Sequence, residues 1–99
     1  MKEISIKELR EKIANKETML VSFSASWCGP CKMLKEELKK VNSTTPIYKV
    51  DVEEDIYFSK EHNVRSVPTM KMFKEGSVVS TTVGVRMAQD INKLIMENV

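Results

Sequence analysis

Hydrophobic residues along the chain fall at two different spacings. Residues 19–25 are mostly apolar, as in a strand that is covered on both faces of a sheet, although Ser22 and Ser24 interrupt the run. After them the apolar residues change to a 3.6-residue period with lysine and glutamate between, which predicts an amphipathic helix. This period is set by Cys31, Leu34, Leu38 and Val41. The change from one spacing to the other places a strand directly before a helix that packs on the sheet.

Two further strand-and-helix units flank this one. A short strand is expected at residues 3–6, and Ser5 with Glu8 has the spacing of a capping box that opens a helix. Residues 47–52 alternate as in a strand, and the acidic run after them suits the first turn of a helix that reaches about residue 62. The first half of the chain therefore predicts strands interleaved with helices.

The second half of the chain predicts a hairpin and a helix. Residues 69–74 and 77–83 are strand-like and flank Glu75-Gly76, a tight-turn signal. A last helix is expected from about Arg86, with no good capping residue before it. This order of elements favours an α/β sheet that is covered by helices on both faces.

Length, composition and charge exclude several classes of protein. A chain of 99 residues has room for one domain and one core. A formal net charge of +2, with lysines spread along the chain, gives no argument for nucleic acid. No apolar run approaches the roughly 18 residues of a membrane span, and the N-terminus has no apolar signal-peptide core. We therefore expect a cytoplasmic protein with no membrane partner.

The two cysteines of the chain carry its chemistry. Cys28 and Cys31 are separated by Gly29 and Pro30, at the junction of the expected strand and helix. A helix N-terminus carries unsatisfied N–H groups and a partial positive charge, which favour the thiolate of Cys28, and the cation of Lys32 acts in the same direction. In such sites the thiol pKa falls from about 8.5 to about 3.5–7.5. The motif thus predicts a reactive cysteine pair.

Other uses of the pair fit the sequence less well. A disulfide that closes so short a ring constrains the unfolded chain little, which argues against a structural staple. A structural zinc site needs four ligands, and His62 is the only histidine, so we expect no metal. His62 itself is expected at a helix end, where a cation is stabilised, with a surface role and no catalytic one.

The sequence resembles the thioredoxin family in three places. Residues 27–32, Trp-Cys-Gly-Pro-Cys-Lys, resemble the family's active-site signature. Residues 64–69 look like the segment that holds a cis-proline, and residues 73–76 followed by Val83-Gly84 look like the last hairpin. The resemblance implies a single thioredoxin domain over residues 1–99. Its expected fold is a central mixed β-sheet of four to five strands flanked by four helices.

The resemblance also implies an activity. Cys28 is the expected nucleophile on a target disulfide, and Cys31 is the expected resolving cysteine that releases the reduced target. The implied partners are disulfide-containing proteins and a thioredoxin-reductase-type protein that supplies electrons. No cofactor is expected beyond the Cys28–Cys31 pair, and the protein is expected to be a monomer.

A substrate groove is carried over from the family position by position. The backbone of Val67, beside the cis-proline, would pair with an extended segment of the target, as in strand addition. Such contacts depend on few side chains of the target. The positions expected to line this groove are Trp27, Gly29, Pro30, Val67, Pro68 and Gly84.

One departure from the family concerns proton transfer. Thioredoxins usually carry a buried Asp on the strand before the motif, and the matching residue here is Ser22. Lys49 matches the lysine that usually lies near this carboxylate, so it is expected to lack its usual partner. Ser22, Lys49 and Lys32 are the expected supporting residues of the site.

Two alternatives to this function remain at this point. One is a redox-independent binding or scaffold module that uses the groove around Trp27 and Pro68. The other is a glutaredoxin-like, glutathione-dependent reductase, for which a Cys-Pro-Tyr-Cys type motif and a Gly-Gly pair before the last helix would be expected, whereas Gly84 stands alone.

Overall fold

The computed structural model describes residues 1–99 and contains a five-stranded sheet with four α-helices. The strand order in the sheet is β1-β3-β2-β4-β5. β1, β3 and β2 are parallel to one another, whereas β4 is antiparallel to both β2 and β5. The elements are β1 (Lys2–Glu3), α1 (Ile6–Ala14), β2 (Met19–Ser24), α2 (Gly29–Lys39), β3 (Ile47–Asp51), the 3-10 helix η1 (Val52–Glu54), α3 (Ile56–Glu61), β4 (Thr69–Lys74), β5 (Ser77–Val83) and α4 (Ala88–Asn98).

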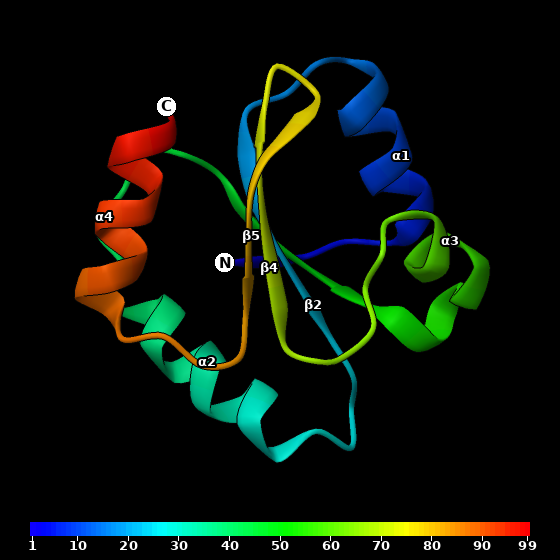
Figure 1. The fold of residues 1–99 in the computed structure, drawn as a ribbon, viewed down its shortest axis with the longest axis horizontal. Helices are drawn as coiled ribbons and strands as arrows, with labels where there is room; N and C mark the ends of the chain where they lie inside the picture. The colour runs from blue at the N-terminus through cyan, green and yellow to red at the C-terminus, as the bar shows by residue number, and fades with distance from the viewer.

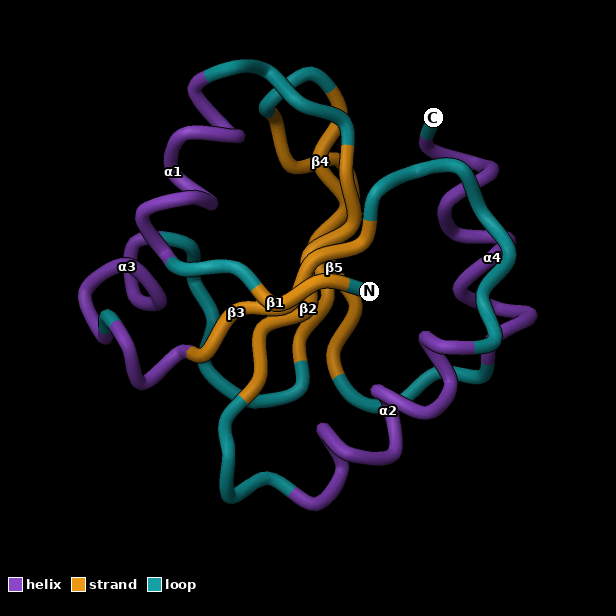
Figure 2. The backbone as a smooth tube through the Cα atoms, turned by 180° about the vertical axis from the view of Figure 1, so that it is seen from behind, coloured by secondary structure: helices purple, strands orange, loops and turns teal.

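The helices form two layers on opposite faces of the sheet. Figure 1 shows the sheet nearly edge-on, with α1 and α3 on one side and α2 and α4 on the other. The view from behind shows the same three layers, with the strands gathered between the helices (Figure 2). The expectation of a mixed sheet covered on both faces and flanked by four helices is confirmed.

The central strand β2 supplies the core on both faces. All six of its residues are buried, and successive side chains point to opposite faces of the sheet. Val21 and Phe23 belong to the core under α1 and α3, together with Phe58 and Phe73. Leu20 belongs to the core under α2 and α4. Strand β2 is therefore fixed from both sides, and its end at Ser24 sets where the following loop begins.

Two predicted boundaries near the acidic segments were wrong. The first strand ends at Glu3, because the capping box of Ser5 and Glu8, which is present as predicted, takes Ile6 into α1. The helix expected over residues 53–62 is two pieces, because Asp55 is extended between them. The Asp55 side chain accepts a hydrogen bond from Phe58 N at 3.0 Å and so starts α3 anew.

The turn between β4 and β5 falls where the sequence predicts it. Glu75 and Gly76 both have positive φ, at 52° and 82°. A Cβ on Gly76 would lie 2.7 Å from the carbonyl oxygen of Ile13, so a side chain there would collide with backbone. This close approach, in addition to the turn, requires glycine at position 76.

The start of α4 is capped from another helix. Met87 occupies the N-cap position and makes no side-chain cap. Instead Glu37 on α2 accepts a hydrogen bond from Ala88 N at 2.9 Å through its Oε1 atom. The hydrogen bond from Lys40 and the one from Ala88 N lower the pKa of Glu37 below the usual carboxyl value. The missing cap in the sequence is thus replaced by a contact between α2 and α4.

We predict that Glu37→Ala lowers the melting temperature by several degrees, because a helix start loses its only side-chain acceptor. Glu36→Ala is the matched control, since Glu36 also pairs with a lysine three residues away but lies exposed and caps nothing. Thermal unfolding followed by circular dichroism near pH 7 measures both. The difference between the two variants should disappear at acidic pH. There the Glu37 side chain that Glu36→Ala retains is protonated in both the folded and the unfolded protein, so it no longer stabilises the fold as a carboxylate. Equal melting temperatures at pH 7 would contradict the role of Glu37 as a cap.

Candidate active site

The cysteine pair lies at the start of α2. Cys28 is the N-cap residue of this helix and forms a disulfide with Cys31 in its first turn. The Sγ atom of Cys28 accepts a hydrogen bond from Cys31 N at 3.1 Å. The helix therefore directs one of its unpaired N–H groups to the sulfur of Cys28, where it favours negative charge once the disulfide is reduced.

The residues between the cysteines leave the site open on one side. Pro30 lies early in α2, where the missing N–H is not needed. A Cβ on Gly29 would meet no atom within 4 Å, so this position faces open space. The cysteines themselves are nearly covered, with 3% of Cys28 and 8% of Cys31 exposed, whereas 68% of Trp27 is exposed. An incoming chain thus meets the tryptophan before it meets the sulfurs.

The segment before β4 closes over the cysteines. The Val67–Pro68 peptide bond is cis, as the resemblance predicted. Val67 packs against the small cluster of Ala25, Cys28 and Cys31. Pro68 O accepts a hydrogen bond from Gly84 N at 2.9 Å, which ties the loop after β5 to the same segment. The structure therefore brings Val67, Pro68 and Gly84, from the segments before β4 and after β5, close to the cysteine pair.

The backbone of Val67 is unpaired within the chain. Neither its N–H nor its C=O makes a hydrogen bond to another residue, although the side chain packs on the cysteines. Backbone groups seldom remain unpaired unless water or another molecule satisfies them. Val67 therefore presents a free donor and a free acceptor beside the disulfide.

The supporting residues differ in how they are placed. Lys32 lies exposed on the first turn of α2 and forms no ion pair or hydrogen bond. Ser22 is buried on β2, directly opposite Lys49 in the β2–β3 register. Lys49 Nζ lies 3.7 Å from Glu3 Oε2 on β1. Lys49 thus lacks its usual partner on β2, as expected, and Glu3, which lies opposite it in the β1–β3 register, supplies a carboxylate instead.

A small polar cavity lies beside Lys49. Its volume is about 220 Å³, and no hydrophobic residue lines it. Ser24 Oγ, on β2 at this cavity, is the one buried side-chain polar atom without a hydrogen-bond partner. The lining residues are Glu3, Ser24, Ser26, Lys49 and Asp51. Ser24, the last residue of β2, thus faces a polar environment rather than a packed core.

His62 is placed differently from the expectation. It ends α3, as predicted, but its ring stacks on Phe58 with 4.2 Å between ring centroids. Burial and the nearby Lys71 ammonium lower the pKa of His62 below its usual value. A cation is therefore disfavoured at this position, because packing on the aromatic core outweighs the helix end.

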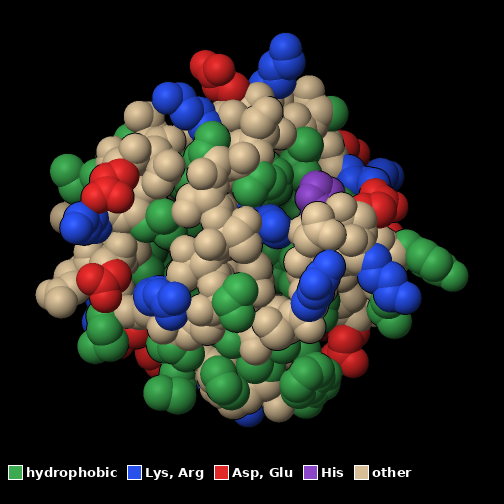
Figure 3. Space-filling view, viewed as in Figure 1, with side chains coloured by type: hydrophobic (Ala, Val, Ile, Leu, Met, Phe, Trp, Pro, Cys, Tyr) green, Lys and Arg blue, Asp and Glu red, His purple; other side chains and the backbone are tan.

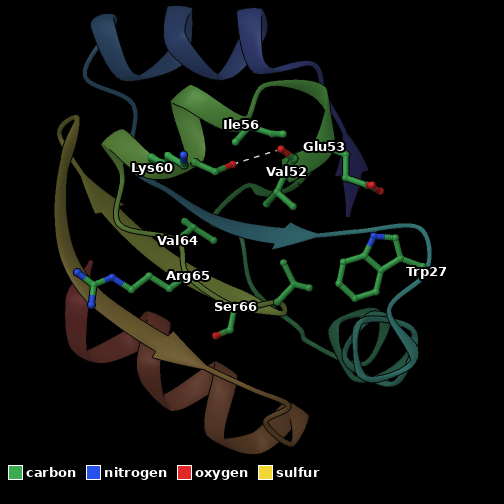
Figure 4. Close-up of a pocket in the computed structure, with 10 residues that line it drawn as sticks. Trp27, Val52, Glu53, Ile56, Lys60, Val64, Arg65 and Ser66 are labelled. Carbon is green, nitrogen blue, oxygen red and sulfur yellow. Dashed lines mark hydrogen bonds between the residues drawn. The ribbon is translucent and has the colours of Figure 1, made fainter.

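A larger and mostly apolar cavity lies beside Trp27, and no sequence pattern indicates it. Its volume is about 470 Å³. Figure 4 shows its walls, formed by Trp27 at one end, by the segment before β4, and by η1 and α3. The lining residues are Trp27, Val52, Glu53, Ile56, Ser59, Lys60, Val64, Arg65, Ser66 and Val67. Only the fold brings α3 next to the tryptophan, so no local pattern could reveal it.

No group of three or more His, Cys, Asp and Glu side chains is arranged to hold a metal ion. None of the four α-helices has the length and hydrophobicity that a membrane-spanning segment requires. The chemical groups that the site presents are a cysteine pair, an exposed tryptophan and an unpaired backbone segment.

Comparison with known sequences gives one consistent result. The thioredoxin family model matches residues 1–97. The chain is 36% identical to a thioredoxin of Chlamydia trachomatis over 83 residues, which cover 81% of each protein. It is 32% identical to a thioredoxin of Mycoplasmoides gallisepticum over 99 residues, which cover 96% of the chain and 99% of that protein.

Comparison with solved structures agrees. A mutant thioredoxin of Halobacterium salinarum superposes with a TM-score of 0.86 at 27% identity, covering 98% of the chain and 90% of that structure. The oxidised mitochondrial thioredoxin 3 of Saccharomyces cerevisiae superposes with a TM-score of 0.82 at 28% identity, covering 98% of the chain and 94% of that structure. The likeness thus extends over nearly the whole length of the chain.

Proposed function

The chain belongs to the thioredoxin family and is a thiol-disulfide oxidoreductase, and we propose that it reduces protein disulfides with Cys28 as nucleophile and Cys31 as resolving cysteine. The observation that carries this assignment is the hydrogen bond from Cys31 N to Cys28 Sγ at the start of α2. Exposure does not distinguish the two sulfurs, since both residues are nearly buried. Their positions on the helix do, because the N-cap sulfur receives the N–H of the first turn.

The reaction transfers two electrons to the target in two exchanges. The Cys28 thiolate attacks one sulfur of the target disulfide, whose S–S bond breaks as a mixed disulfide forms and the leaving thiolate takes up a proton. Cys31 then loses its proton and attacks Cys28 Sγ. The second target thiolate is released, and the Cys28–Cys31 disulfide seen in the structure remains. The target is reduced and the cysteine pair is oxidised.

The target is held by backbone pairing at Val67. The unpaired N–H and C=O of this residue lie in the segment that packs on the cysteines, so an extended target segment bound there brings its disulfide to Cys28. The exposed ring of Trp27 supplies apolar contact. The other expected groove positions, Gly29, Pro30, Pro68 and Gly84, leave space for the passing chain or hold the segment in place.

The electrons come from a thioredoxin-reductase-type partner, since thioredoxins generally receive them in this way. The protein needs no cofactor other than its cysteine pair and acts as a monomer. A cytoplasmic location suits this role, because a reducing compartment favours the dithiol form that the first exchange needs.

Cys31→Ser tests the two roles. The variant should accumulate a covalent adduct with a disulfide-bonded substrate, because Cys28 still attacks and nothing resolves the mixed disulfide. Mass spectrometry of the unreduced mixture should find the adduct on Cys28, and dithiothreitol should release it. Cys28→Ser is the matched control and should give less than about one-tenth as much adduct, because the remaining thiol is not the N-cap sulfur. Equal trapping by both variants would contradict the assignment.

Cys31 loses its proton without a carboxylate on β2 to accept it. Ser22 cannot accept it as an aspartate would, and Lys49 has its ion pair with Glu3 on the neighbouring strand. The polar cavity beside Lys49 supports a route through water, because its lining contains only polar and charged residues.

Ser22→Asp tests this route. A carboxylate opposite Lys49 gives Cys31 an internal base, so the pH dependence of the resolving step should shift, with the largest gain in rate at acidic to neutral pH. Stopped-flow release of target thiol from a preformed mixed disulfide, measured across the pH range, follows this step. Ser22→Ala is the control and should leave the profile unchanged. An unchanged profile in Ser22→Asp would mean that another group already takes the proton.

A further inference from the structure

The apolar cavity between Trp27 and α3 is accessible to a substrate. Ile56 and Trp27 lie at its rim with 61% and 68% of their surfaces exposed, and Val52, Val64 and Val67 line it below. Large exposed apolar groups that surround a concavity are typical of a binding site. Figure 3 shows hydrophobic side chains gathered at the end of the molecule where Figure 1 places the loop between β2 and α2.

The cavity is continuous with the place where the target is held. Trp27 and Val67 line both, and Val67 also packs on the cysteines. A target segment that pairs with the backbone of Val67 therefore runs along the mouth of the cavity. A side chain of that segment, a short distance from its reactive cysteine, is then directed into the cavity, since alternate side chains of an extended segment point to opposite sides.

The charges around the cavity are unequal at its two ends. Lys60 and Arg65 are exposed and form no ion pair or hydrogen bond through their side chains. Figure 4 shows both at the end away from Trp27, whereas Glu53 lies at the Trp27 end. The far end of the cavity therefore presents two cations that form no ion pair with a carboxylate of this chain.

We propose that the cavity selects substrate proteins by a large apolar side chain next to an acidic residue, both near the reactive cysteine. The apolar side chain enters the cavity among Val52, Ile56 and Val64. The carboxylate next to it lies at Lys60 and Arg65. This inference rests on the proposed function, because it uses the backbone pairing at Val67 to place the substrate.

The two parts of the recognition act differently. Burial of an apolar side chain strengthens binding at any salt concentration. The lysine and arginine are exposed, so their attraction for a carboxylate is screened by salt and acts mainly on the rate of association. The charge preference should therefore appear in kcat/KM at low ionic strength and fade at high ionic strength.

The test uses four cystine-linked peptides that differ at two positions near the reactive cysteine. One position carries leucine or serine, and the other carries glutamate or lysine. For the native protein at low salt, kcat/KM should be about fivefold higher with glutamate than with lysine beside leucine, and this ratio should approach one at about 0.5 M salt. Leucine should exceed serine by about fivefold or more at both salt concentrations.

Matched variants assign the preferences to residues. Lys60→Glu with Arg65→Glu should abolish or reverse the preference for glutamate. Lys93→Glu is the control for one such charge reversal, since Lys93 is exposed on α4 across the sheet, and should leave the preference unchanged. Ile56→Ser should reduce the preference for leucine, whereas Met96→Ser, which also removes an exposed apolar side chain, should not.

The outcomes separate this inference from the function on which it rests. If the native protein reduces all four peptides at equal rates, the selection is wrong and the reductase activity stands. A preference for glutamate that survives the double charge reversal would also overturn the inference, because other cations would then recognise the substrate. If no peptide is reduced, the proposed function itself is wrong.

Discussion

The hydrogen bond between Cys31 N and Cys28 Sγ is the contact on which the site depends. It makes the sulfur of Cys28 the cap of α2, so the chemistry and the start of the helix share one atom. The sheet fixes the position of this sulfur, because β2 is buried on both faces and ends four residues before Cys28. The sheet thus places the sulfur at the start of the helix, and the partial positive charge of the helix N-terminus favours the thiolate of Cys28.

Local patterns were sufficient for most of the helices and strands and for the cysteine pair, whereas the mixed sheet flanked by four helices was implied by the resemblance to the thioredoxin family. The capping box of Ser5, the 3.6-residue period of α2 and the Glu75-Gly76 turn each depend on residues close in the chain, and each is present. The boundaries that were wrong lie at positions where a single capping side chain determines where a helix begins. Asp55 could continue a helix or start one, and its extended backbone starts α3.

Contacts between distant elements could not be predicted from the sequence. The cap of α4 by Glu37, the ion pair of Lys49 with Glu3 and the cavity beside Trp27 each need two elements to meet. His62 shows the same limit, since its helix-end position favours a cation, whereas its burial against Phe58 and the nearby Lys71 ammonium lower its pKa. The activity is therefore evident from three short segments of the sequence, whereas the proposed selection of substrates depends on surfaces that only the fold assembles.

The reduction potential of the Cys28–Cys31 pair tests the central claim most directly. It is measured by equilibrating the protein with known ratios of reduced and oxidised dithiothreitol or glutathione and following Trp27 fluorescence. A reductase of protein disulfides predicts a strongly reducing value, near the roughly −270 mV that is characteristic of thioredoxin. A value above about −200 mV would contradict the account, because electrons would then flow from target thiols to this protein.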